Sequence, residues 1–126
     1  MARNTVLCVD DDSSVLTAIQ NVLESGSYKT LCATSGAEAL RIFRQEESGL
    51  MGAFIDIKMP GLDGLEVMRE IRKTSDLPGV AVSAYLDKVT LGECEKAGFT
   101  GYIHKPFSVE NLLKAVGEFR EYAERN

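Results

Sequence analysis

The chain has 126 residues, a length typical of one domain, and its 44% hydrophobic and 26% charged residues are those of an ordinary globular protein rather than a disordered or collagen-like one. A formal net charge of −5, without any basic run, argues against a nucleic-acid partner. The first apolar stretch, Val6 to Val9, stops at Asp10, so neither a signal peptide nor a membrane span is expected. We expect one cytoplasmic domain over residues 1–126 with no output domain.

Short apolar runs alternate with segments of helical spacing along the chain. The apolar runs predict five strands, at Thr5 to Val9, Lys29 to Ala33, Ala53 to Ile57, Gly79 to Ser83 and Gly101 to His104. A helix is expected after each strand. Apolar residues at helical spacing indicate the first, with Val15, Ile19, Val22 and Leu23, and the third, with Leu65, Met68 and Ile71. The second opens with the capping-box sequence Ser35-Gly36-Ala37-Glu38, the fourth covers Asp87 to Ala97, and the last follows the capping residue Ser108.

The fourth helix is the least regular of the five. Val89, Thr90 and Gly92 are poor helix formers, and a glycine inside a helix costs about 1 kcal/mol relative to alanine. We therefore expect a loosely held helix over Asp87 to Ala97.

Five strand–helix repeats predict a doubly wound α/β fold. The strands are too continuously apolar to have a solvent-facing side, which favours a parallel sheet covered by helices on both faces. Ligands bind to such sheets outside the carboxyl ends of the strands. The residues at the strand ends are therefore the candidates for function.

Four of the five predicted strands end in polar or charged residues: Asp10-Asp11-Asp12, Asp56, Ser83 and Lys105-Pro106. Each alone could be an ordinary solvated strand end, but parallel strands bring these ends together. Two carboxylates about 4 Å apart repel each other by roughly 4 kcal/mol at an effective dielectric near 20. Lys105 supplies one compensating charge, and Mg²⁺ is the leading candidate for another. A carboxylate, a metal, a hydroxyl and an ammonium group together indicate a phosphoryl-transfer site.

The three cysteines form an odd set. Cys8, Cys32 and Cys94 contain no C-x-x-C pair, and two of them lie in predicted strands, where a thiol behaves as a small hydrophobic group. We expect them to be structural and reduced.

The sequence resembles the response-regulator receiver domains of two-component signalling systems, and in particular those of the chemotaxis-regulator type. Four segments carry the resemblance, in the family's order: Val6 to Asp12, Phe54 to Gly64, Val82 to Ala84 and Gly101 to Phe107. Together they extend from the first strand to the start of the last helix. The resemblance implies a flavodoxin-like strand order 2-1-3-4-5, and it also implies a cis peptide bond between Lys105 and Pro106.

The resemblance also implies a role for each site residue. Asp56 would accept a phosphoryl group from a sensor histidine kinase, a phosphotransfer protein or a small acyl phosphate. Lys105 and Ser83 would contact the phosphoryl group. Asp10, Asp11, Asp56 and the backbone carbonyl of Lys58 would hold Mg²⁺ or Mn²⁺. Ser83 and Tyr102 would act as the switch that alters a binding face for a downstream protein or for an output domain outside this chain.

Lys58 and Tyr85 occupy positions near the site that vary widely in similar domains. Lys58 could alter water access to the phosphoryl group, and the ring of Tyr85 could shield it. Ser83 stands where threonine is more common, which keeps the hydroxyl group.

Three other functions remain open from the sequence. Asp10 and Asp12 have the D-x-D spacing of haloacid-dehalogenase-like phosphatases, in which they would be nucleophile and general acid, but those enzymes usually add a cap and further acidic motifs, for which this chain has little room. A flavodoxin-like cofactor site is disfavoured, because three aspartates would repel a flavin phosphate. A receiver-like scaffold that never takes phosphate is disfavoured by the intact set of site residues.

Overall fold

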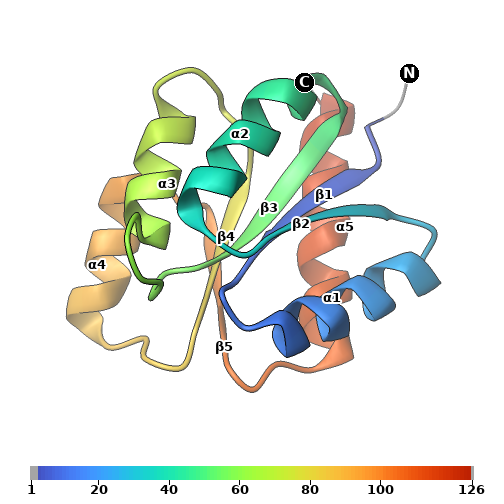
Figure 1. Ribbon diagram of the computed structural model, residues 1–126. Helices are drawn as coiled ribbons and strands as arrows, with labels where there is room; N and C mark the ends of the chain where they lie inside the picture. The colour runs from blue at the N-terminus through green and yellow to red at the C-terminus, as the bar shows by residue number, and fades with distance from the viewer. Residues whose placement is uncertain (1–2, 126) are drawn as a thin grey trace.

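The computed structural model describes residues 3–125. Five strands alternate with the helices (Figure 1): β1 (Thr5–Val9), β2 (Lys29–Ala33), β3 (Leu50–Asp56), β4 (Gly79–Ser83) and β5 (Gly101–His104). The helices are α1 (Ser13–Ser25), α2 (Gly36–Glu46), α3 (Gly64–Arg72), α4 (Lys88–Ala97) and α5 (Val109–Arg125), and a short 3-10 helix, η1 (Glu47–Gly49), precedes β3. Among the helices of this part of the chain, none combines the length and the apolar character needed to cross a bilayer.

The strands form one parallel sheet in the order β2-β1-β3-β4-β5. This is the predicted flavodoxin-like order, and it confirms the doubly wound α/β fold. Helices α1 and α5 lie on one side of the sheet, and α2, α3 and α4 lie on the other (Figure 1).

Two apolar layers hold the helices against the sheet. The side under α1 and α5 contains Phe54 and Phe119, whose ring centroids are 5.3 Å apart. A Cβ atom on Gly52 would come within 2.3 Å of the Phe119 ring, so glycine in β3 lets α5 approach the sheet closely. The other layer joins the buried faces of α2, α3 and α4, with Phe43, Met68 and Ile71 among its largest members.

The edge strands differ from the expectation that no strand has a solvent-facing side. β1, β3 and β4 are almost wholly buried, whereas β2 and β5 are partly exposed because each pairs with only one neighbour. The third strand also begins earlier and ends earlier than predicted, at Leu50 and Asp56. Asp56 is therefore the last residue of the strand.

Side-chain caps begin the helices. Ser35 accepts a hydrogen bond from the backbone N–H of Glu38, as the sequence predicts, but the Glu38 carboxylate accepts from Thr34 rather than from Ser35. The complete capping box lies at Asp63 and Glu66, at the start of α3, where each side chain accepts from the other's backbone N–H. Ser108 accepts from the N–H of Asn111 in the first turn of α5, as predicted.

The C-terminal end of α4 is tied to the loop that follows α3. The Arg72 guanidinium donates hydrogen bonds to the backbone carbonyls of Ser75, Leu77 and Gly98. Gly98 ends α4 in the left-handed region, with φ of 104°. One side chain thus joins the ends of two neighbouring helices.

Candidate functional site

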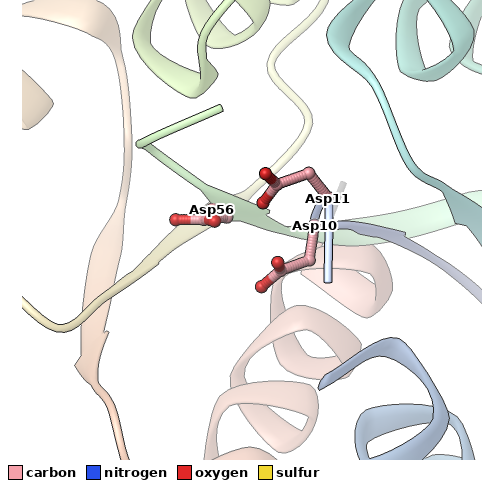
Figure 2. A group of neighbouring side chains, drawn as sticks. All are labelled: Asp10, Asp11 and Asp56. Atoms are coloured by element: carbon pink, nitrogen blue, oxygen red, sulfur yellow. The ribbon is translucent and has the colours of Figure 1, made fainter. Parts of the chain in front are cut away.

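Three aspartates from two central strands meet at the carboxyl edge of the sheet. Asp10 and Asp11 follow β1, and Asp56 ends β3, the strand next to β1. One carboxylate oxygen from each lies within 4.8 Å of the other two (Figure 2). The structure thus brings together the three carboxylates predicted from the strand ends.

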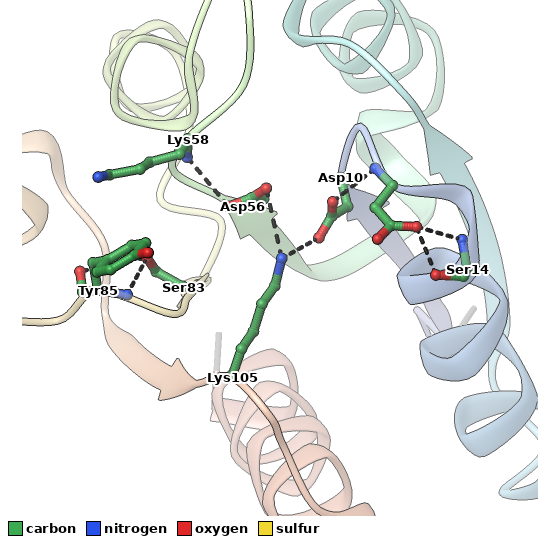
Figure 3. Close-up of polar contacts among 8 residues, drawn as sticks. Asp10, Ser14, Asp56, Lys58, Ser83, Tyr85 and Lys105 are labelled. Atoms are coloured by element: carbon green, nitrogen blue, oxygen red, sulfur yellow. Dashed lines mark hydrogen bonds and ion pairs between the residues drawn. The ribbon is translucent and has the colours of Figure 1, made fainter.

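Lys105 is the cation of this cluster. Its ammonium Nζ lies 2.8 Å from Asp10 Oδ2 and 3.6 Å from Asp56 Oδ2 (Figure 3). Burial alone would lower the pKa of Lys105, but its hydrogen bond to Asp10 and the charge of Asp56 outweigh burial and raise the pKa above its usual value. Lys105 therefore carries a positive charge, and the bond between Lys105 and Pro106 is cis, as expected.

Asp10 is the most buried of the three aspartates, with 1% of its surface exposed. Besides the ion pair with Lys105, it accepts a hydrogen bond from the backbone N–H of Asp12 at 2.9 Å. A charge this deeply buried needs both partners.

Asp56 is also buried, but Lys105 compensates its charge less closely than that of Asp10. It is 6% exposed, and it accepts a hydrogen bond from the backbone N–H of Lys58 at 3.2 Å. Burial raises the pKa of Asp56 to about 6, and the carboxylate of Asp10 adds to this shift, whereas the N–H of Lys58 and the charge of Lys105 oppose it. An additional positive charge close to Asp56 would therefore stabilise its carboxylate.

Asp11 differs from Asp10 and Asp56 because it is exposed. Within residues 3–125, its carboxylate has no hydrogen-bond or ion-pair partner, so it is available to an incoming cation.

Asp12 does not join the acidic cluster. Its carboxylate caps α1 and accepts hydrogen bonds from both the backbone N–H and the hydroxyl of Ser14, at 2.9 and 2.6 Å. The hydrogen bond from the Ser14 hydroxyl, and to a smaller extent that from the Ser14 N–H, lowers the pKa of Asp12. A carboxylate stabilised as the anion is a poor general acid, which disfavours the phosphatase in which Asp12 would donate a proton.

The loop after Asp56 is held close to the strand end. Gly64 begins α3, and a Cβ atom there would lie 2.2 Å from the carbonyl oxygen of Asp56. Gly61, directly after Pro60, has a φ of 74°, a positive value that glycine adopts readily in a turn. The start of α3 therefore packs directly against the backbone of the candidate acceptor.

Ser83 ends β4 one position after Val82, the register partner of Asp56. It is 2% exposed, and its hydroxyl oxygen accepts a hydrogen bond from the N–H of Tyr85 at 3.0 Å. The ammonium of Lys58 lies 4.5 Å from the centre of the Tyr85 ring, a cation–π contact that bridges the loops after β3 and β4 (Figure 3). The sequence indicated that both residues lie near the site but not that they touch each other.

Tyr102 lies on the edge strand β5, opposite Ala81 of β4, and its side chain is 59% exposed. The predicted switch residue thus points outward in this structure.

The donor set of the cluster fits a hard divalent cation. Carboxylate oxygens are the ligands that Mg²⁺ and Mn²⁺ prefer in proteins, and three of them converge here beside a single ammonium group. The acidic pocket of Asp10, Asp11 and Asp56 could therefore hold a metal ion.

Residues 6–117 match the family model described as the response regulator receiver domain. The chain belongs to this family. A receiver domain from Clostridium thermocellum, described as a response regulator receiver domain protein, is 29% identical with a TM-score of 0.89, and the match covers 98% of each chain. The Vibrio cholerae chemotaxis protein CheY4 is 27% identical with a TM-score of 0.87, over 94% of this chain and 99% of that one. This receiver domain is thus similar to proteins of the chemotaxis-regulator type.

A curated relative from Bacillus subtilis is named "Probable C4-dicarboxylate response regulator DctR". It is 31% identical to this receiver domain over 130 residues, a match that covers 99% of this chain and 57% of the relative. The chain spans about half the length of the curated relatives it matches, several of which are named as transcriptional regulators.

The raised pKa of Asp56 predicts a pH-dependent cost of folding. Since the folded-state pKa of about 6 lies above the ordinary value of 3.8, the stability that this group contributes is complete below about pH 4 and is lost as the pH rises through about 6. We expect Asp56→Asn to be more stable than the unchanged domain at pH 7, by on the order of 2 kcal/mol, and to approach it near pH 4. Urea unfolding of both proteins without divalent metal measures this difference. A difference that does not change with pH would contradict the prediction.

Proposed function

We propose that this receiver domain accepts a phosphoryl group onto Asp56 from the phosphohistidine of a sensor histidine kinase or a phosphotransfer protein. The observation that carries the proposal is a buried carboxylate at the end of β3 with two further carboxylates within 4.8 Å and the ammonium of Lys105 at 3.6 Å. This arrangement offers one nucleophile among groups that neutralise charge.

In the proposed reaction, a carboxylate oxygen of Asp56 attacks the phosphorus atom. A bond forms between that oxygen and phosphorus, the bond from phosphorus to the donor's imidazole nitrogen breaks, and the nitrogen keeps the electron pair. Lys105 compensates negative charge on the phosphoryl oxygens, and the hydroxyl of Ser83 donates a hydrogen bond to one of them. In the structure, the Ser83 hydroxyl contacts the backbone of Tyr85. It would have to rotate to donate a hydrogen bond to a phosphoryl oxygen.

Asp10, Asp11 and Asp56, with the backbone carbonyl of Lys58, would hold Mg²⁺ or Mn²⁺. Such an ion supplies positive charge that lets an anionic phosphoryl donor approach an anionic nucleophile. The backbone of Lys58 lies beside the Asp56 carboxylate, as its N–H bond to Asp56 shows, which supports its carbonyl as a further ligand.

We propose a signalling domain rather than an enzyme acting on a separate substrate. Phosphorylation and dephosphorylation would both occur on the domain itself. The phosphatase alternative needs Asp10 as nucleophile, yet Asp10 is paired with Lys105 at 2.8 Å and is the most buried of the cluster. Residues 1–126 would form this one domain, without direct binding to nucleic acid.

Metal-dependent labelling tests the proposal. We expect incubation with acetyl phosphate and Mg²⁺ to add the mass of one phosphoryl group to the intact protein, and we expect no adduct when EDTA removes the metal. The mass is measured by electrospray spectrometry under conditions that preserve acyl phosphates. Absence of the adduct at saturating Mg²⁺ would overturn the proposal.

We propose that phosphorylation alters a partner-binding face made by α4, β5 and α5. Ser83 would move toward the phosphoryl group and draw the loop that leads to α4, and Tyr102 would turn inward. Helix α4 suits this role, because Gly92 weakens it and Val89 is 71% exposed. The partner would be a downstream protein or an output domain, as the greater length of the curated relatives suggests.

Amide hydrogen exchange tests the switch. We expect beryllofluoride, which mimics the phosphoryl group, to change protection between Ser83 and Tyr102 in the presence of Mg²⁺. The Asp56→Asn variant is the matched control, because it lacks the carboxylate to which beryllium binds. Identical protection with and without the mimic would refute the switch, although Asp56 could still accept phosphate.

A further inference from the structure

Two of the three cysteines lie side by side on neighbouring strands. Cys8 in β1 and Cys32 in β2 are direct register partners in the parallel sheet. Parallel neighbours are about 4.8 Å apart, which lies within the range of roughly 4.4–6.8 Å between the Cα atoms of disulfide-bonded residues. Both side chains also belong to the apolar layer beneath α1 and α5, so they project from the same face of the sheet.

The two thiols differ in their access to solvent. Cys8 is fully buried, and its Sγ lies 3.9 Å from the carbonyl oxygen of Val6. Cys32 is partly exposed, because β2 is an edge strand. A small oxidant from solvent therefore reaches Cys32 first, and Cys8 lies beside it on the neighbouring strand.

The local environment favours reaction at Cys32. The hydrogen bond with Cys8 lowers the pKa of Cys32 to about 7, although burial and the charge of Glu24 oppose this shift. A substantial fraction is then thiolate, the reactive form, at neutral pH. Cys94 offers a contrast within the same chain: it lies in the opposite apolar layer, and burial raises its pKa.

We propose that Cys8 and Cys32 form a redox-active dithiol that a hydroperoxide converts into an intramolecular disulfide. The Cys32 thiolate attacks one oxygen of hydrogen peroxide, which breaks the O–O bond and leaves Cys32 as a sulfenic acid and hydroxide. The Cys8 sulfur then attacks the sulfenic sulfur, the S–S bond forms, and the S–O bond breaks. The hydroxyl group released from the sulfenic acid takes the proton of Cys8 and leaves as water. The proton that Cys32 lost at the start combines with the hydroxide from the first step and gives a second water molecule. Two thiols and one peroxide thus yield one disulfide and two waters.

This site lies in the scaffold behind the acidic cluster. Cys8 is two residues before Asp10, and the backbone N–H of Asp10 donates to the carbonyl of Ala33, the neighbour of Cys32. The inference does not depend on phosphoryl transfer, because it concerns only the two thiols.

Peptide mapping of the peroxide-treated protein tests the proposal. After removal of peroxide, the protein is denatured in iodoacetamide, and its mass is compared with that of the untreated protein. We expect a single alkylated cysteine, Cys94, against three in the untreated protein, and full recovery of three after dithiothreitol. Trypsin cleaves after Arg3, Lys29 and Arg41, so the two peptides that hold Cys8 and Cys32 should appear joined.

Matched variants sharpen the test. Cys94→Ser should form the same disulfide as the unchanged chain. Cys8→Ser should form none and should instead accumulate oxidised Cys32, which a sulfenic-acid probe such as dimedone labels. Three alkylatable cysteines after peroxide, a disulfide that includes Cys94, or one that joins two chains would each overturn the proposal, and the first measurement needs no variant.

Discussion

The Asp56→Asn variant should take up no phosphoryl group from acetyl phosphate in Mg²⁺, under conditions in which the unchanged receiver domain is labelled. Asparagine preserves the size of the side chain and can still contact the N–H of Lys58 through its amide oxygen, but an amide is not a nucleophile toward phosphorus. Intact-mass spectrometry over the same time course measures the loss, which we expect to be complete within detection.

Asp12→Asn is the matched control for this experiment. Asp12 lies in the same acidic run but caps α1 away from the cluster, and asparagine is also a good N-cap residue. We expect it to be labelled at the rate of the unchanged domain. Undiminished labelling of Asp56→Asn, or loss of labelling in Asp12→Asn, would contradict the assignment of Asp56 as the sole acceptor.

Mg²⁺ affinity should fall further in Asp11→Ala than in Asp10→Ala. Asp11 is exposed and has no partner among the described residues, so its charge is free for the cation, whereas that of Asp10 is largely compensated by Lys105. Loss of a supporting group behind a metal ligand costs about 10–100-fold in affinity, and we expect Asp10→Ala in this range and Asp11→Ala beyond it.

Isothermal titration of Mg²⁺ into each variant measures these affinities, with Asp12→Asn as the control for a charge removed outside the cluster. Equal losses in Asp10→Ala and Asp11→Ala would show that the two carboxylates contribute symmetrically. An affinity unchanged in Asp11→Ala would remove it from the ligand set.

The strands and the gathering of the site could be predicted because both depend on local pattern and on one rule of geometry. Continuous apolar runs correctly placed four of the five strands, and parallel strands necessarily bring Asp10, Asp11 and Asp56 to one edge. The sequence does not predict the start of β3, because Gly52 interrupts the apolar run. The reason for a glycine at this position is the Phe119 ring of α5, which packs directly against it.

The spacing of the site residues along the sequence does not predict which charged groups pair with each other. Whether Lys105 pairs more closely with Asp10 or with Asp56 depends on side-chain directions across three strands. The role of Asp12 had a local signal, since an aspartate one residue before a helix is a common cap, and the pattern recurs at Asp63 and Asp87. The contact between Lys58 and Tyr85 joins two loops that are far apart in the sequence, and neither loop has a sequence pattern that predicts it.

The attachment of Arg72 to the end of α4 has a consequence for how that helix can move. Three backbone carbonyls, including that of Gly98, hold the guanidinium at the C-terminal end of α4, while the hydrogen bonds that Asp87 accepts at the other end come from Thr90 and Leu91 of α4 itself. Displacement should therefore be largest near Asp87 and smallest near Gly98. Helix α4 would swing about a fixed pivot at its C-terminal end rather than slide along the sheet, which turns a small shift of the loop after Ser83 into a change of tilt.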